Sequence, residues 1–244
     1  MKILALDTSS RAATVAVMED DRLIAEQTTN HKKTHSEKLL PIIERTLGDG
    51  SFVPQDIDVF AVSLGPGSFT GLRIGMATVK AIAQTLNKTV VGVSTIEALA
   101  YNIPYSKHLI CPIIDAQRDL VYTGLFKWEG DAPSKIKEES VMNIEELIAE
   151  LKEMDEKVIF LGDAVEKFQD RLKKELGTQC EIPKGAMLIP RAYSVGLLAK
   201  RQLDHGYRKE LHEVIPIYMR KSQAERQYEE KLKREQEEAR KKES

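Results

Sequence analysis

The sequence contains few of the residues that mark a secreted, disulfide-bonded or zinc-binding protein. It has only two cysteines, Cys111 within an apolar run and Cys180 beside Glu181. Their spacing fits neither a disulfide framework nor a zinc site. We therefore expect two reduced, structural thiols in a cytoplasmic protein.

Long hydrophobic runs and an excess of positive charge are also missing from the sequence. The first apolar run, residues 3–6, ends at Asp7 and is too short for a signal-peptide core. No segment approaches the roughly 20 apolar residues of a membrane span. Because the net charge is −2, we expect any RNA contact to need a local basic patch or a partner.

Strand-like and helical patterns alternate along the first hundred residues. Three short runs open the chain as an antiparallel meander, and a capping-box spacing from Thr34 to Glu37 begins the first helix. Pro41 lies within that helix and should kink it. We expect strands at residues 3–6, 14–17, 23–27, 59–64 and 90–93, and helices at 34–47, after Gly71 to Leu86, and 94–101.

The same alternation begins again after Pro104, and the repeated plan predicts two related lobes, residues 1–103 and 104–220. The final segment from about residue 211 packs on the first lobe or stays with the second. We expect strands at 109–114, 121–126 and 158–161, helices at 144–154, 164–176 and 193–203, and an extended segment at 216–220.

Residues 221–244 are nearly all Glu, Lys, Arg and Gln and have no apolar stripe. Oppositely charged residues recur four apart, which favours a helix weakly. We expect a solvated helical or disordered tail, and a contact with a partner or RNA is the alternative.

Polar residues follow the first strand in a tight hairpin. Asp7, Thr8 and Ser9 are candidates to hold a metal-bound phosphate, or they form a turn closed by the Asp and Ser side chains. Asp115 and Asp163, in turns of the second half, allow the same two interpretations. These are weak candidates for cofactor binding, and no catalytic residue is assigned.

The segment Gly65-Pro-Gly-Ser-Phe-Thr-Gly71 combines three glycines and a proline before a helix. A helix N-terminus attracts anions, but the spacing matches neither a P-loop nor a dinucleotide fingerprint. The loop is therefore a close-packed turn or a phosphate contact. The helix that follows is apolar around much of its circumference and rich in Gly and Ala, which favours a helix–helix interface over burial in the chain's own core.

His31 and His35 are four residues apart, a spacing that some metal sites use. Lys32 and Lys33 lie between them, and two ammonium groups oppose a cation. We predict no metal site.

These segments together resemble the TsaB (YeaZ) family, across residues 1 to about 222. The resemblance implies an actin-like ASKHA (ribonuclease H-like) α/β fold, with a mixed sheet and helices in each of two related lobes. The motifs that carry it are Ile3-Leu-Ala-Leu-Asp-Thr-Ser9, His35-Ser-Glu-Lys-Leu-Leu-Pro41, Gly65-Pro-Gly-Ser-Phe-Thr-Gly-Leu-Arg-Ile-Gly75, Gly92-Val-Ser-Thr95, Ile114-Asp-Ala-Gln-Arg118 and Pro216-Ile-Tyr-Met-Arg220.

The resemblance also implies a function. TsaB proteins are non-catalytic dimerisation subunits that act with TsaD and TsaE in forming N6-threonylcarbamoyladenosine at position 37 of tRNAs that read ANN codons. A homodimer when alone, tRNA contact only through the complex, and no cofactor are expected. The family pairs through two helices, and the residues expected at that interface are His35, Leu39, Leu40, Ile43, Leu72, Gly75, Met76 and Val79.

The chain departs from the family at two turns of the second lobe. It has Asp115-Ala-Gln-Arg118 in place of Asp-Ala-Arg, and Gly162-Asp-Ala-Val165 in place of Gly-Asp-Gly-Ala. Both departures argue against independent ATP binding. The competing hypothesis is an independent ATP-binding or metallopeptidase-type enzyme of the same fold.

Overall fold

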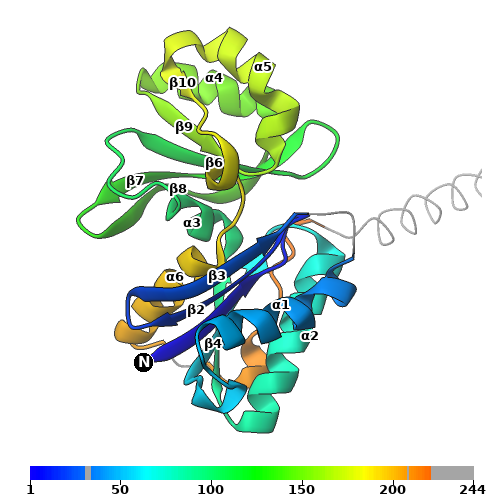
Figure 1. Cartoon of the computed structure of the whole chain (residues 1–244). Coiled ribbons are helices and arrows are strands. Elements are labelled where there is room, and N and C mark those ends of the chain that lie inside the picture. The colour runs from blue at the N-terminus through cyan, green and yellow to red at the C-terminus, as the bar shows by residue number, and fades with distance from the viewer. Residues whose placement is uncertain (31–33, 208, 221–244) are drawn as a thin grey trace, which may run out of the picture.

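The computed structural model describes residues 1–30, 34–207 and 209–220 (Figure 1). Each of its two lobes contains a five-stranded mixed sheet with helices, so the expected actin-like architecture is confirmed. The predicted charged tail, residues 221–244, lies outside the described residues.

The first sheet has the strand order β3-β2-β1-β4-β5. β1 (Lys2–Asp7), β2 (Ala13–Glu19) and β3 (Arg22–Thr29) form the predicted antiparallel meander. β4 (Val59–Gly65) and β5 (Thr89–Ser94) run parallel to β1. Seven consecutive buried residues make up β4, as expected for a central strand covered on both faces.

Two helices cover each face of this sheet. α1 (His35–Asp49) and α2 (Phe69–Leu86) pack on one face, and α3 (Thr95–Ala100) and α6 (Ala192–Asp204) pack on the other. The predicted capping box opens α1, and the helix continues through Pro41, so the proline does not end it.

The second sheet has the order β10-β9-β6-β7-β8. Its strands are β6 (Leu109–Asp115), β7 (Leu120–Glu129), β8 (Ala132–Asn143), β9 (Val158–Leu161) and β10 (Cys180–Glu181). The sequence analysis missed β8 because this edge strand is mostly only partly buried and contains several Lys and Glu residues.

α4 (Ile144–Met154) and α5 (Ala164–Leu176) cover one face of the second sheet. Short helical turns complete the chain at Pro54–Asp56, Gly177–Gln179, Gly185–Leu188 and Leu211–Glu213.

The predicted second lobe, residues 104–220, needs a correction. α6 returns to the first lobe, where Val195 and Leu198 join the core formed with Ile3 and Ala5. The apolar periodicity of this segment identified a helix but carried no information about which sheet it covers. Val214 also lies in the first-lobe core, which is the first of the two alternatives for the final segment.

The joint between the lobes is apolar. Ile96 and Leu99 of α3 pack against Ile110 and Phe126 of the second sheet, and all four are fully buried. A short helix of the first lobe thus covers the second sheet's remaining face.

Asn102 ties the returning chain to this joint. Its Nδ2 donates to the backbone oxygens of Met187 (3.1 Å) and Ile189 (2.8 Å), and its Oδ1 accepts a hydrogen bond from Ser194 Oγ (2.9 Å). The Asn102 side chain therefore connects the segment that leaves α3 to the segment that leads into α6.

Asn102→Ala should lower the free energy of unfolding by about 2–3 kcal/mol, because it removes the partner of the buried Ser194 hydroxyl and of two part-buried backbone oxygens. Urea unfolding followed by circular dichroism measures the change. The matched control is the exposed Asn30, whose replacement by Ala should cost less than about 0.5 kcal/mol. Equal effects of the two substitutions would contradict the anchoring role of Asn102.

Candidate functional site

The hairpin after β1 is a turn closed by side chains. Asp7 Oδ1 accepts hydrogen bonds from the backbone N of Ser9 (2.9 Å) and from Ser9 Oγ (2.8 Å). Asp7 and Thr8 are each only 1 % exposed. Of the two interpretations of this motif, the structure therefore favours the closed turn, with the Asp7 carboxylate enclosed by protein.

Burial also changes the acidity of Asp7. Loss of hydration raises the pKa of the Asp7 carboxyl above its ordinary value of 3.8, and the hydrogen bonds from Ser9 oppose that shift. Folding thus shifts this group toward its protonated form relative to the unfolded chain.

The glycine-rich loop packs directly on this turn. A Cβ atom on Gly67 would lie 2.4 Å from the backbone oxygen of Ser9, and one on Gly71 would lie 2.0 Å from that of Thr8. On Gly75, a Cβ would lie 2.3 Å from Thr8 Oγ1. Of the two interpretations of the loop, the structure therefore favours the close-packed turn.

Two hydrogen bonds fix this contact. Thr8 Oγ1 donates to the backbone oxygen of Gly71 at 2.8 Å, and the backbone N of Ser68 donates to the backbone oxygen of Ser9 at 2.7 Å. Ser68 is also the N-cap of α2, because its Oγ accepts a hydrogen bond from the backbone N of Gly71.

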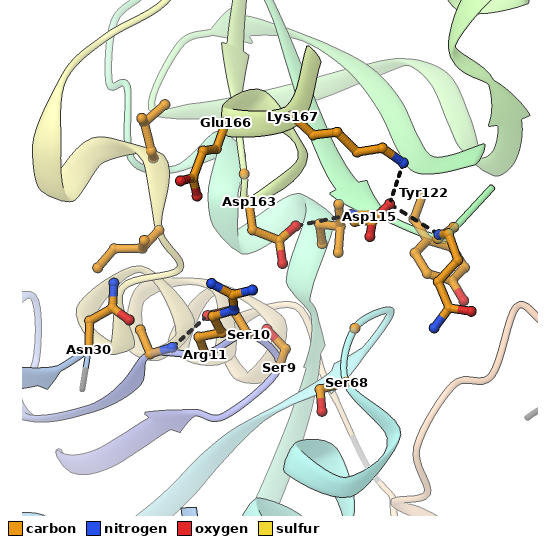
Figure 2. Close-up of a pocket in the computed structure, with 18 of the residues that line it drawn as sticks. Ser9, Ser10, Arg11, Asn30, Ser68, Asp115, Tyr122, Asp163, Glu166 and Lys167 are labelled. Atoms are coloured by element: carbon orange, nitrogen blue, oxygen red, sulfur yellow. Dashed lines mark hydrogen bonds and ion pairs between the residues drawn. The ribbon is translucent and has the colours of Figure 1, made fainter. Parts of the chain in front are cut away.

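A cleft of about 1120 Å³ separates the two lobes above this turn (Figure 2). Its residues follow the carboxyl ends of β1, β4, β6 and β9, where ligands of open α/β sheets usually bind. Ser9 and Asp115 line it, whereas Asp7 and Thr8 are not among its lining residues.

The upper wall of the cleft is acidic but largely paired. Asp163 Oδ1 accepts a hydrogen bond from the backbone N of Asp115 at 3.0 Å, and Lys167 Nζ lies 3.6 Å from Asp115 Oδ1 and 3.5 Å from Asp119 Oδ1. Burial, and then the neighbouring Asp115 charge, raise the pKa of Asp163 above its ordinary value. Lys167 thus offsets the charge that Asp115 could offer to a ligand.

The sequence analysis missed several of the polar residues in the cleft: Arg11, Asn30, Glu166, Lys167 and Arg220. Arg11 and Asn30 come shortly after strands of the first sheet, a signal that the sequence pattern could have supplied. Glu166 and Lys167 lie in α5 and Arg220 lies in the final segment, so only the fold brings them to the cleft.

The histidine pair is only partly described. His35 begins α1, and its Nε2 lies 2.8 Å from the backbone oxygen of Ser10, so it ties α1 to the first hairpin. His31 lies outside the described residues. Within the described chain, no group of three His, Cys, Asp or Glu residues is placed to hold a metal.

The proposed interface residues need a larger correction. Six of the eight lie inside the chain, within or beneath α1 and α2, because each helix turns its most apolar face to the first sheet. These six are Leu39, Ile43, Leu72, Gly75, Met76 and Val79. His35 lines the cleft and is half-buried, and Leu40 is 58 % exposed.

The outward faces of α1 and α2 are still unusual. α2 exposes Ala77 and Ala81, and Ile74 is half-buried beside them. Leu40 projects from the neighbouring helix α1. We call these four residues the docking face; they are exposed or half-buried apolar side chains of α1 and α2, two helices that contact each other.

Comparisons with known proteins agree with the resemblance. The family model for TsaD, tRNA N6-adenosine threonylcarbamoyltransferase, matches residues 22–228. The "tRNA threonylcarbamoyladenosine biosynthesis protein TsaB" of Bacillus subtilis (strain 168) is 34 % identical over 225 residues, covering 92 % of this chain and 96 % of that protein.

Solved structures show the same similarity. YeaZ from Pseudomonas aeruginosa is 25 % identical with a TM-score of 0.71, covering 89 % of this chain and 99 % of that one. An uncharacterized protein similar to peptidase YEAZ from the same organism is 26 % identical with a TM-score of 0.75, covering 90 % and 99 %.

A more distant structure shows the fold alone. The Acidaminococcus fermentans (R)-2-hydroxyglutaryl-CoA dehydratase component A has a TM-score of 0.50 at 11 % identity, covering 84 % of this chain and 99 % of that one. The fold and the interlobe cleft thus define a protein of the actin-like ASKHA class. Within that class, the chain belongs to the TsaB (YeaZ) family.

The glycine contact makes a prediction about stability. Gly71→Ala should lower the free energy of unfolding by about 2–3 kcal/mol, because the new methyl group overlaps the Thr8 carbonyl. The matched control is Gly48→Ala in α1, where a Cβ meets nothing within 4 Å. That change should stabilise the protein by about 0.5–1 kcal/mol through helix propensity. Urea unfolding measures both, and a Gly71→Ala protein as stable as wild type would contradict the close contact.

The acidity of Asp7 makes a prediction about pH. Because the folded pKa is raised, the folded state binds more protons than the unfolded state, and Asp7 lowers stability as pH rises through that pKa. The stability of Asp7→Asn relative to wild type should therefore increase between about pH 4 and pH 7. Urea unfolding across that range tests it, with Asp131→Asn, a 97 % exposed carboxylate, as the control for charge loss. A relative stability that falls with pH would contradict the prediction.

Proposed function

We propose that this TsaB homologue is a non-catalytic, partner-binding subunit of the complex that forms N6-threonylcarbamoyladenosine at position 37 of tRNAs that read ANN codons. The observation that carries the proposal is the docking face, Leu40, Ile74, Ala77 and Ala81. Within a family of threonylcarbamoyladenosine biosynthesis proteins, such a face suits a protein partner of complementary shape.

The proposed partner is TsaD, with TsaE joining the assembly. Side by side on one face of the first sheet, α1 and α2 offer two adjacent helices to a matching pair from the partner. Small side chains at Ala77 and Ala81 allow another helix to approach the α2 backbone closely. In the absence of TsaD, the same face serves a homodimer.

The enclosed hairpin supports a role without catalysis. The Asp7 carboxylate is held in a turn and does not line the cleft, and Lys167 lies beside Asp115. These arrangements leave neither Asp7 nor Asp115 poised to hold a metal-bound phosphate.

The protein is proposed to contact tRNA only through the complex and to work in the cytoplasm. Its net charge of −2 does not favour direct binding to the phosphates of tRNA. None of the helices in the described part of the chain has both the length and the hydropathy to cross a membrane.

One observation favours the competing hypothesis of an independent ATP-binding enzyme. The cleft, about 1120 Å³ in volume, is large enough for a nucleotide. ATP hydrolysis by the isolated full-length chain, at a rate that rises with its concentration and is lost with a variant at an exposed cleft residue such as Arg11→Trp, would support that hypothesis over the subunit role.

The docking face makes the central prediction. Ala77→Arg should weaken the complex with TsaD from the same organism at least about tenfold, because it places a long charged side chain where a helix must approach. Arginine is a good helix former and this position is exposed, so the fold should be retained. Size-exclusion chromatography with light scattering, followed by titration calorimetry, measures the complex.

Ile136→Arg is the matched control, since Ile136 is 48 % exposed on β8 of the other lobe. It should leave the affinity unchanged. The proposal fails if wild type forms no complex with TsaD, or if Ala77→Arg and Ile136→Arg bind it equally well.

A further inference from the structure

The last described residues connect the two lobes. We define residues 214–220 as the C-terminal strap. Val214 anchors it in the first-lobe core, and the backbone N of Ile217 donates to the backbone oxygen of Leu64 at 2.8 Å. At its other end, Arg220 donates a hydrogen bond to the backbone oxygen of Ala116 in the second lobe. The strap therefore spans the joint.

The middle of the strap is held by α2. The ring of Tyr218 stacks on Phe69 with their centroids 4.4 Å apart and their planes 1° from parallel. Arg73 Nε donates to Tyr218 Oη at 2.9 Å, and its guanidinium carbon lies 5.6 Å from the centre of the same ring. Phe69 and Arg73 are both residues of α2, the helix that carries most of the docking face.

The strap also exposes apolar surface. Ten large hydrophobic residues of the described chain are exposed, and three of them fall in this short segment: Ile215 (60 %), Ile217 (45 %) and Tyr218 (41 %). Since Tyr218 contacts α2, this surface continues the docking face. A protein partner seated on α2 would therefore cover the strap as well.

The far end of the strap holds a turn in the cleft wall. Ala116 and Gln117 line the cleft, and Gln117, Arg118 and Asp119 all have positive φ angles, 63°, 53° and 60°. Three successive left-handed residues other than glycine persist only where their surroundings hold them. The hydrogen bond from Arg220 to Ala116 is one such restraint.

We propose that the C-terminal strap couples the docking face to the interlobe cleft. A partner that packs on Tyr218 in its stacked position stabilises the strap, and the strap in turn stabilises the turn at residues 116–120 through Arg220. Because such coupling is reciprocal, a ligand that orders this turn in the cleft also strengthens partner binding. The inference rests on the proposed function, since the partner is the TsaD protein proposed to bind α2.

Hydrogen exchange of the full-length chain, alone and saturated with TsaD from the same organism, tests the coupling. The informative amides are those of Ala116 and Leu120, which donate to the backbone oxygens of Leu120 and Gln117. TsaD should slow their exchange by roughly three- to tenfold in wild type, the effect of stabilising about one hydrogen bond. Light scattering on the same samples shows whether the complex has formed.

Three variants separate the steps. Arg220→Ala should still form the complex but lose the slowing at residues 116–120, and Tyr218→Ala should lose it as well. Ile136→Ala, an exposed apolar residue away from the strap, should keep it. Slowing that survives Arg220→Ala, or that is missing from a wild-type complex of the expected mass, overturns the coupling alone. If no complex forms, the proposed function fails and the coupling fails with it.

Discussion

The structure depends on the direct contact between two backbone segments, the hairpin after β1 and the glycine-rich loop before α2. The backbone oxygens of Thr8 and Ser9 occupy the space that side chains on Gly71 and Gly67 would need. This contact fixes the residue at which α2 begins and the position of α2 over the first sheet. It also forms the floor of the cleft, so the position of that floor and the position of α2 both depend on this contact.

The joint between the two lobes is apolar on one side and polar on the other. Apolar packing of α3 on the second sheet closes the joint at its back, and the cleft with its charged walls opens in front. Asn102 satisfies three hydrogen-bonding partners at the boundary between them. The C-terminal strap reaches the cleft side of this joint, where Arg220 is one of the lining residues.

The sequence predicted most helices and strands well because the burial of each one appears in the sequence as a periodic pattern of apolar residues. The meander β1–β3, the capping box of α1 and the run of β4 were all recognisable in this way. The sequence contains no such pattern for which elements pack against one another, so α6 was placed in the wrong lobe. The polar edge strand β8 was missed as well. For the site, Ser9 and Asp115 were found in the cleft, whereas Arg11 and Arg220 were not, since only the fold brings them together.

The small residues of α2 show how packing and docking can be separated within one helix. Gly71 and Gly75 face inward, and the atoms of Thr8 leave no room for a side chain at either position. Ala77 and Ala81 face outward, where nothing within the described chain requires a small residue. The fold thus explains the small residues on one side of the helix, and those on the other side belong to the proposed docking face. Of the residues expected at the interface, Leu39, Leu72 and Val79 are buried because they lie on the inward faces of α1 and α2, which pack on the first sheet.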